Sequence, residues 1–472
     1  MGIIALAGMA LGLFWFWIPV VWLIIPAAVA AAWMACEVRT SRCFGKNLAV
    51  LLVCAFLVRL LAALANGVLA ERYTGVNEPW DLVPDGSVYV SYGYYLSELM
   101  TGRAAPEAYK ILVHRLEHNY AWPGWTWYQV TGMSYWNGLW FSVFATTPVA
   151  IWLMNGLASL LSAVLLFRFL RHRYDERVAV LGFGALLFYP TLVLWSASGS
   201  KESLVVLSSV IFLLALNAFL TWPMRRRHLG LGMVLGVSAI AAYFLRSYIA
   251  GLLAITALLT MAGRVVAGIW GSRRWWARIG LIAVLALAAT IGWERGTEVM
   301  ERLYQHSLRR SVANYYVDPI GTTGYRIYPQ RYYERDYVYL VEGNALKLSR
   351  LTWTERASTA ARALARFFFS PYLGDVAQSR ILSMLYPLAL LNMALCPFVM
   401  VGCWRGLQKD PALLPLMGFM LVVAFVVGLH NGNVGTVVRI KDMVMPFYLV
   451  LAAVGIGEVM NWRPNAGTLP LI

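Results

Sequence analysis

Apolar stretches of about twenty residues recur along the chain, joined by short polar connections or by two long polar loops. A helix of this length and composition spans the hydrocarbon core of a bilayer. A membrane barrel would instead need strands in which polar and apolar residues alternate, and these stretches do not alternate. The pattern therefore predicts an all-α polytopic membrane protein with about 11–12 transmembrane helices and two long outward-facing loops.

The first apolar stretch, residues 3–35, is too long for one straight span and short for two spans with a turn. Two interpretations are kept: the stretch forms one span, or it forms a hairpin broken at Pro19 and Pro26. Arg59, near the middle of the next span, is expected either to face a partner inside the bundle or to snorkel towards the membrane surface. The later spans are expected at residues 47–70, 144–167, 178–196, 204–222, 229–244, 248–268, 279–293, 381–401, 412–429 and 444–460.

These stretches divide the chain into five predicted segments. The N-terminus lacks the basic region of a cleavable signal, so the first segment is expected to be retained. The segments are an N-terminal membrane segment with the first clear span (1–70), a first outer loop (71–142), a central transmembrane bundle (143–293), a second outer loop (294–380) and a C-terminal transmembrane bundle (381–472).

Positive charge is concentrated in short clusters beside the apolar stretches, and the formal net charge of the chain is +16. Such clusters mark the cytoplasmic ends of transmembrane helices and contact lipid headgroups, so no nucleic acid is expected as a partner. When the spans are counted, all clusters fall on one side, which places both long loops outside and the C-terminus in the cytoplasm. The clusters are Arg39, Arg42 and Lys46; Arg168, Arg171, Arg173 and Arg177; Arg225, Arg226 and Arg227; Arg264, Arg273, Arg274 and Arg278; and Arg405 and Lys409.

Some functional classes find no support in the sequence. No Walker loop, dinucleotide-binding glycine motif or zinc-ligand spacing occurs in a suitable context, which argues against an ATP-driven pump. None of the five cysteines lies in the long outer loops, so no disulfide framework is expected.

The first outer loop contains an acidic, tyrosine-rich stretch at residues 81–99. It predicts a short amphipathic helix with Tyr92 on its apolar face and Ser91 on its polar face, which suits the water–lipid interface. Asp85 lies at the start of this helix, and Asp81 lies one turn earlier. Two interpretations remain: Asp85 is a catalytic base held at the membrane surface, or it only caps the helix.

Basic residues stand at the expected outer ends of several spans. Lys201 begins a helix whose dipole opposes a cation, so an anionic partner is expected, either Glu202 or a ligand. A lysine that snorkels to the headgroups is the alternative. Arg246 separates two apolar stretches, and Arg439 and Lys441 stand at the mouth of the last span. These positions suit a phosphate group at headgroup depth.

The second outer loop interleaves arginines and tyrosines between residues 325 and 335. On the outer side of a membrane, sugar rings on the aromatic residues and phosphate on the arginines are the expected partners. A solvated charged loop is the alternative. The residues predicted to contact an acceptor or a sugar are His114, Tyr325, Arg326 and Arg331.

Three short motifs occupy these outer positions. They are an acidic residue followed by an interfacial helix (84–94), a proline-bearing span that ends in a serine–lysine–acid turn (188–204) and an arginine-then-proline ending (433–447). Together they resemble bacterial membrane glycosyltransferases of the GT-C superfamily, particularly the protein-mannosyltransferase-like family found with surface-polysaccharide synthesis. The chain differs from the usual pattern in the separation of Asp81 from Asp85 and in an extra apolar segment before the first matching span.

The resemblance implies an inverting glycosyltransferase of GT-C-like fold at the outer face of a bacterial inner membrane. The donor would be a polyprenyl-phosphate-linked sugar, and the acceptor a glycan or glycolipid. Asp85 or Asp81 would act as the catalytic base. No cofactor is indicated, and whether these two aspartates hold a divalent metal stays open. The residues expected to bind the donor phosphate are Lys201, Arg246, Arg439 and Lys441.

Two other functions fit part of the pattern. An O-antigen polymerase or ligase also has many spans and a late arginine-rich outer loop, and its important residues would be His306, Arg326 and Arg331. A transporter or flippase of polysaccharide precursors would show inverted repeats and broken midplane helices. No such repeat is evident in the sequence.

Overall fold

The structure is a computed structural model of the 472-residue chain. It describes residues 19–39, 44–74, 84–103, 132–144, 148–221, 225–271, 361, 364–372, 380–408, 410–430 and 434–462. Within these residues the regular secondary structure is helical, and no β-strand occurs. The predicted all-α class is therefore confirmed for the described part of the chain.

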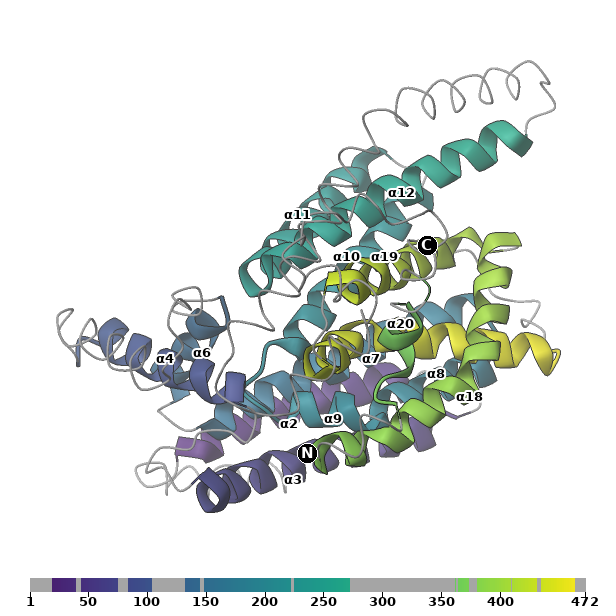
Figure 1. Cartoon of the computed structure of the whole chain (residues 1–472). Coiled ribbons are helices and arrows are strands. Elements are labelled where there is room, and N and C mark those ends of the chain that lie inside the picture. Colours follow the sequence, from purple (N-terminus) through teal and green to yellow (C-terminus); the bar gives the residue numbers. More distant parts are fainter. Residues whose placement is uncertain are drawn as a thin grey trace, which may run out of the picture. The chain divides into compact units, whose positions relative to one another are not determined.

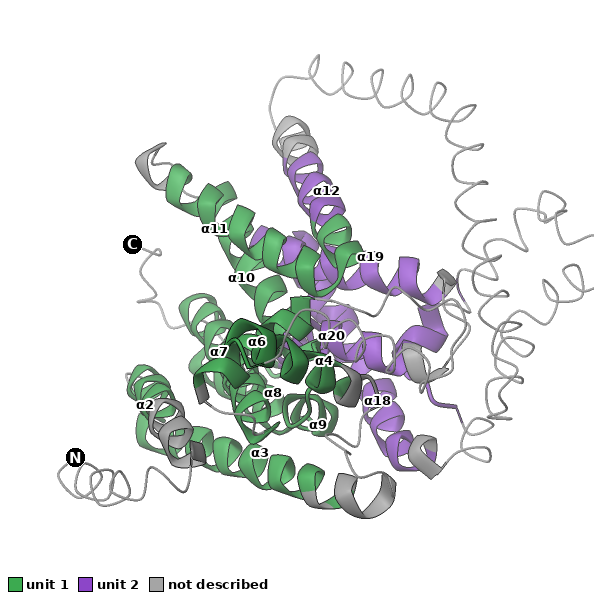
Figure 2. Ribbon diagram, turned by 90° about the vertical axis from the view of Figure 1, so that its left-hand side faces the viewer, with its two compact units in different colours: residues 1–253, 457–472 green, residues 254–456 purple. Residues whose placement is uncertain are grey.

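The helices divide between two compact units, coloured separately in Figure 2. Unit 1 comprises residues 1–253 and 457–472, and unit 2 comprises residues 254–456. The five segments predicted from the sequence are a different division and stay a prediction. In chain order (Figure 1) the helices are α2 (Pro19–Arg39), α3 (Gly45–Thr74), α4 (Pro84–Met100), α6 (Gly132–Phe144), α7 (Pro148–Arg173), α8 (Glu176–Phe188), α9 (Pro190–Ser196), α10 (Glu202–Thr221), α11 (Arg225–Leu245), α12 (Ser247–Gly271), α18 (Arg380–Gln408), the 3₁₀ helix η3 (Pro411–Leu413), α19 (Leu414–His430) and α20 (Val434–Val459).

Seven described helical stretches are long and apolar enough to cross a membrane. Each coincides with a span predicted from hydropathy, which confirms a multi-pass membrane protein. The predicted span 444–460 lies in α20, the predicted span 279–293 lies outside the described residues, and the total of about 11–12 stays a prediction. The seven are Gly45–Gly67, Pro148–Arg173, Glu202–Thr221, His228–Leu245, Ser247–Arg264, Ser383–Gln408 and Pro411–Gly428.

The described part of the N-terminal apolar stretch lies in α2. Helix α2 runs without a break through Pro26, so the hairpin break considered at that residue is not seen.

On α11, Leu229, Met233 and Val237 are each more than 60% exposed and are spaced one turn apart. A continuous apolar face of this kind suits contact with lipid chains.

One predicted span, residues 178–196, is a bent pair of helices. α8 and α9 meet at an angle of 52°, with Tyr189 extended between them. Pro190 causes the break, because its ring lacks the N–H that would continue α8 and clashes with the preceding turn. At the break, the carbonyl oxygen of Leu187 accepts a hydrogen bond of 2.9 Å from Arg59 Nη1. Arg59 is buried, which confirms an interior partner for this charge.

Helix α4 confirms the short helix predicted after the first acidic residues, but its surroundings differ from the prediction. It packs closely against α6, an element that was not predicted inside the first outer loop (Figure 1). A Cβ atom on Gly93 would lie 2.4 Å from Asn137 Cβ of α6, so only glycine permits this approach. Ser91, predicted to be on a solvated face, is buried together with Tyr92. The expected polar face of α4 is therefore not fully solvated.

Candidate functional site

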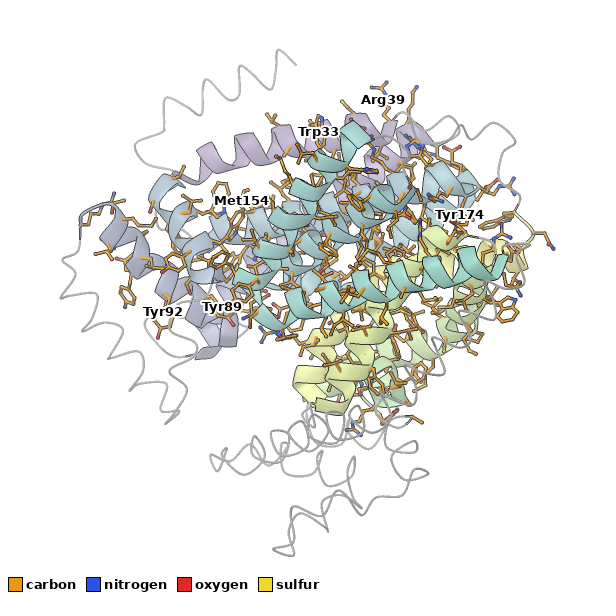
Figure 3. The ribbon with its side chains drawn as sticks, turned by 90° about the horizontal axis from the view of Figure 1, so that it is seen from above. Trp33, Arg39, Tyr89, Tyr92, Met154 and Tyr174 are labelled. Atoms are coloured by element: carbon orange, nitrogen blue, oxygen red, sulfur yellow. The ribbon has the colours of Figure 1, made fainter. Side chains whose placement is uncertain are left out.

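The first component of the site is the start of α4. Asp85 is the second residue of this helix, and Tyr89 follows one turn later. Tyr89 is fully buried, and it extends from α4 as shown in Figure 3. The backbone therefore places Asp85 about one helical turn before Tyr89. Asp81, the other predicted acid, lies outside the described residues.

The second component is the connection between α9 and α10, which carries Lys201. This lysine is only 8% exposed, and its Nζ lies 4.8 Å from the centroid of the Tyr89 ring. A cation over an aromatic face at this distance is stabilised by the ring quadrupole. The buried ammonium does not match a lysine that snorkels to the headgroups. The structure thus brings together two motifs, in α4 and before α10, that were predicted separately.

The third component is an ion pair between Glu202 and Arg246. Arg246 Nη2 donates to Glu202 Oε1 at 2.6 Å, with the two side chains 10% and 2% exposed respectively. Arg246 occupies the single non-helical residue between α11 and α12, and its Nη1 also donates to the Tyr248 hydroxyl at 2.7 Å. Glu202 was predicted as one option for the partner of Lys201. The structure shows that it binds Arg246.

We call these side chains the unit 1 cluster: Tyr89, Lys201, Glu202, Arg246 and Tyr248. The cluster combines two cations with one carboxylate, all of them largely buried. A guanidinium held in place by a carboxylate and a hydroxyl is preorganised for a second anion. The cluster has the chemistry to bind a phosphate group near the start of α4. Sequence reasoning missed Tyr89, although its place one turn after Asp85 was a usable signal.

Unit 2 contains a separate cluster around the start of α20. Lys441 Nζ donates to the carbonyl oxygen of Ser370 at 2.7 Å, and both residues are buried. Arg366 is also buried, with its guanidinium 5.4 Å from the centroid of the Tyr372 ring. Arg439, the other predicted phosphate ligand on this helix, is half-buried. The described contact of Lys441 anchors a backbone segment, and its predicted phosphate role stays a prediction.

Arg366 was not predicted as a candidate. Its signal in the sequence is an arginine directly before the apolar run of Phe367, Phe368 and Phe369, where a charge needs a specific partner. The remaining predicted residues, His114, His306, Tyr325, Arg326 and Arg331, lie outside the described residues. Across the described ranges, no group of three or more histidine, cysteine, aspartate or glutamate side chains is placed to hold a metal ion.

Comparisons with known proteins do not assign the chain to a family. No protein-family model matches it, and no curated protein matches it. Among solved structures, it is similar to the crystal structure of the Archaeoglobus fulgidus oligosaccharyltransferase in the apo form, with a TM-score of 0.39 and 14% sequence identity. The match covers 87% of this chain and 50% of that chain, so this chain spans about half the length of that protein.

Proposed function

We propose that the chain is a membrane glycosyltransferase of the inverting, GT-C type. It transfers a sugar from a polyprenyl-phosphate-linked donor to a glycan or glycolipid at the outer face of a bacterial inner membrane, in surface glycan synthesis. The observation that carries the proposal is the contact of Lys201 with Tyr89. It joins a buried cation to the helix whose first turn contains Asp85.

The chemistry divides between an acid and the cations. The Asp85 carboxylate takes the proton of an acceptor hydroxyl, whose oxygen attacks the anomeric carbon of the donor sugar. The bond between that carbon and the phosphate oxygen breaks, so polyprenyl phosphate leaves and the anomeric configuration inverts. Lys201 and Arg246 stabilise the negative charge that develops on the leaving phosphate. Glu202 holds the Arg246 guanidinium in position for this role.

The outer loops supply the remaining parts of the proposal. His114, Tyr325, Arg326 and Arg331 are proposed to contact the acceptor or the sugar. Arg439 and Lys441, which belong to unit 2, are also proposed to bind the donor phosphate. A divalent metal at Asp81 and Asp85 is not required by the steps above.

The test is Asp85→Asn in the full-length protein, together with mass spectrometry of surface glycans and lipid-linked intermediates in cells with and without the chain. Asparagine keeps the size of the side chain, and a carboxylate in the first turn of a helix contributes only about 0.3–1 kcal/mol, so folding and donor binding should survive. Turnover should fall by about 10²- to 10⁴-fold, the usual share of general base catalysis. The intact donor lipid should accumulate, and one sugar should be missing from the glycan.

Other outcomes point elsewhere. Unchanged turnover in both Asp85→Asn and Asp81→Asn would remove the first outer loop from catalysis. Loss of the whole polymer, with its repeat unit still complete on the lipid, would indicate a polymerase or ligase. A purified protein that moves lipid-linked precursors across vesicles without transferring sugar would indicate a transporter.

A further inference from the structure

The connection between α9 and α10 is held by amide side chains from two other helices. Asn155, fully buried in α7, donates from Nδ2 to the carbonyl oxygens of Ser198 at 2.7 Å and Ser200 at 3.0 Å. Asn66, buried in α3, donates from Nδ2 to the carbonyl oxygen of Ala197 at 3.0 Å. Three carbonyls of one short connection are thus bound by side chains that are distant in sequence.

These bonds matter because the connection is buried and non-helical. Ala197, Ser198 and Ser200 are each at most 2% exposed, so water does not satisfy their backbone carbonyls. A buried carbonyl without a partner is costly, so these side-chain donors stabilise the observed path of the connection. The connection ends at Lys201, whose own carbonyl accepts the first hydrogen bond of α10 from the Val205 N–H at 3.0 Å. The path of this backbone therefore sets the position of Lys201 and of Glu202, the first residue of α10.

The orientation of the Asn155 amide follows from its partners. Nδ2 carries two protons and faces two carbonyl oxygens, whereas the reversed amide would place Oδ1 against both and repel them. Oδ1 accepts no hydrogen bond within the described part of the chain, so Asn155 acts as a double donor. An aspartate of the same size cannot donate, and alanine removes both bonds.

We infer that Asn155 is a positioning residue for phosphate binding by the unit 1 cluster. It fixes the carbonyls of Ser198 and Ser200, and thereby places the Lys201 ammonium over Tyr89 and the Glu202 carboxylate against Arg246. This inference rests on the proposed function, because it assigns Asn155 to the proposed donor site. Asn66 supports the same connection through its bond to the Ala197 carbonyl.

The experiment measures lipid binding by the full-length protein in nanodiscs, with polyprenyl phosphate and the uncharged polyprenol as probes. Asn155→Ala should weaken polyprenyl phosphate binding by about 10-fold, the effect of misplacing one charged partner of a phosphate. Polyprenol binding should not change, because the alcohol has no anion for Lys201. General damage to the bundle would weaken both probes alike, so the difference between them isolates positioning.

A double-mutant cycle adds a second readout. If Asn155 acts partly through Lys201, then the loss of binding in the double variant Asn155→Ala/Lys201→Ala should be smaller than the two single losses combined. The matched control is Ser162→Ala, two turns further along α7, which loses only a local bond of 2.9 Å to the Ala158 carbonyl. This control should bind both probes like the parent protein.

Each result decides the inference. A folded Asn155→Ala variant that binds polyprenyl phosphate like the parent overturns it, and so does full additivity with Lys201→Ala. If Asn155→Ala does not fold, Asn66→Ala, which loses the bond to the Ala197 carbonyl, takes its place with the same two probes and the same criteria. A parent protein that does not distinguish polyprenyl phosphate from polyprenol would refute the proposed donor site itself, which is a separate outcome.

Discussion

The ion pair between Glu202 and Arg246 predicts a large, asymmetric effect on stability. The two side chains are 2% and 10% exposed, and their closest atoms are 2.6 Å apart. Glu202→Gln keeps the size of the side chain and an oxygen that accepts a hydrogen bond. It removes the negative charge, and it leaves the Arg246 guanidinium buried with the Tyr248 hydroxyl as a neutral partner.

The magnitude follows from charge separation and burial. Charge centres about 4 Å apart attract each other by about 4 kcal/mol at an effective dielectric constant of about 20. Breaking a buried pair by removing one partner costs about 3–5 kcal/mol, because the other charge stays buried. Because glutamine keeps an oxygen that accepts a hydrogen bond, Glu202→Gln should lower the free energy of unfolding by about 3 kcal/mol, the lower end of this range. Removing both charges, as Glu202→Gln with Arg246→Gln, should cost less than the sum of the single changes.

The assay is reversible unfolding in bicelles, read as the free energy of unfolding of the four proteins in the cycle. Glu98→Gln is the matched control, because its pair with Arg103 is longer, at 3.4 Å, and the arginine is 64% exposed. An exposed pair of this kind contributes less than about 1 kcal/mol. A loss for Glu202→Gln no greater than for Glu98→Gln, or strict additivity in the cycle, would refute the reasoning.

Three further predictions concern binding, packing and topology. Lys201→Ala should weaken polyprenyl phosphate binding by about 10- to 100-fold, and an unchanged affinity in a lipid-binding titration would remove this residue from the donor site. Gly93→Ala should separate α4 from α6 and lower the thermal unfolding temperature, because its methyl group meets a backbone-proximal carbon of α6, whereas Gly236→Ala on α11 has open space and should be silent. On a cysteine-free background, a cysteine at the exposed Arg103 should react with an impermeant thiol reagent only from outside, and one at the exposed Gln408 only from inside. Labelling of Gln408→Cys from outside would reverse the predicted topology.

The sequence by itself determined the class of the protein and the approximate positions of its described spans. Each of the seven described spans was predicted from a run of apolar residues, because the thickness of the hydrocarbon core imposes a length that is visible locally. The short helix that begins at Pro84 was also predictable, since the turn residues and tyrosine spacing are local signals. Lys201 and Arg246 could be chosen as candidates because charges beside apolar stretches are conspicuous, and their phosphate role stays a prediction.

Only the tertiary structure decided which polar groups meet. Glu202 binds Arg246, 44 residues away, although Lys201 is its neighbour in sequence. Arg59 binds a carbonyl 128 residues away, and Asn155 binds two carbonyls more than 40 residues away. Each partner is set by the helices that pack around it, and a buried polar group takes whichever partner that packing presents. Hydropathy indicates where a helix crosses the membrane, but it does not indicate which other helices pack against it.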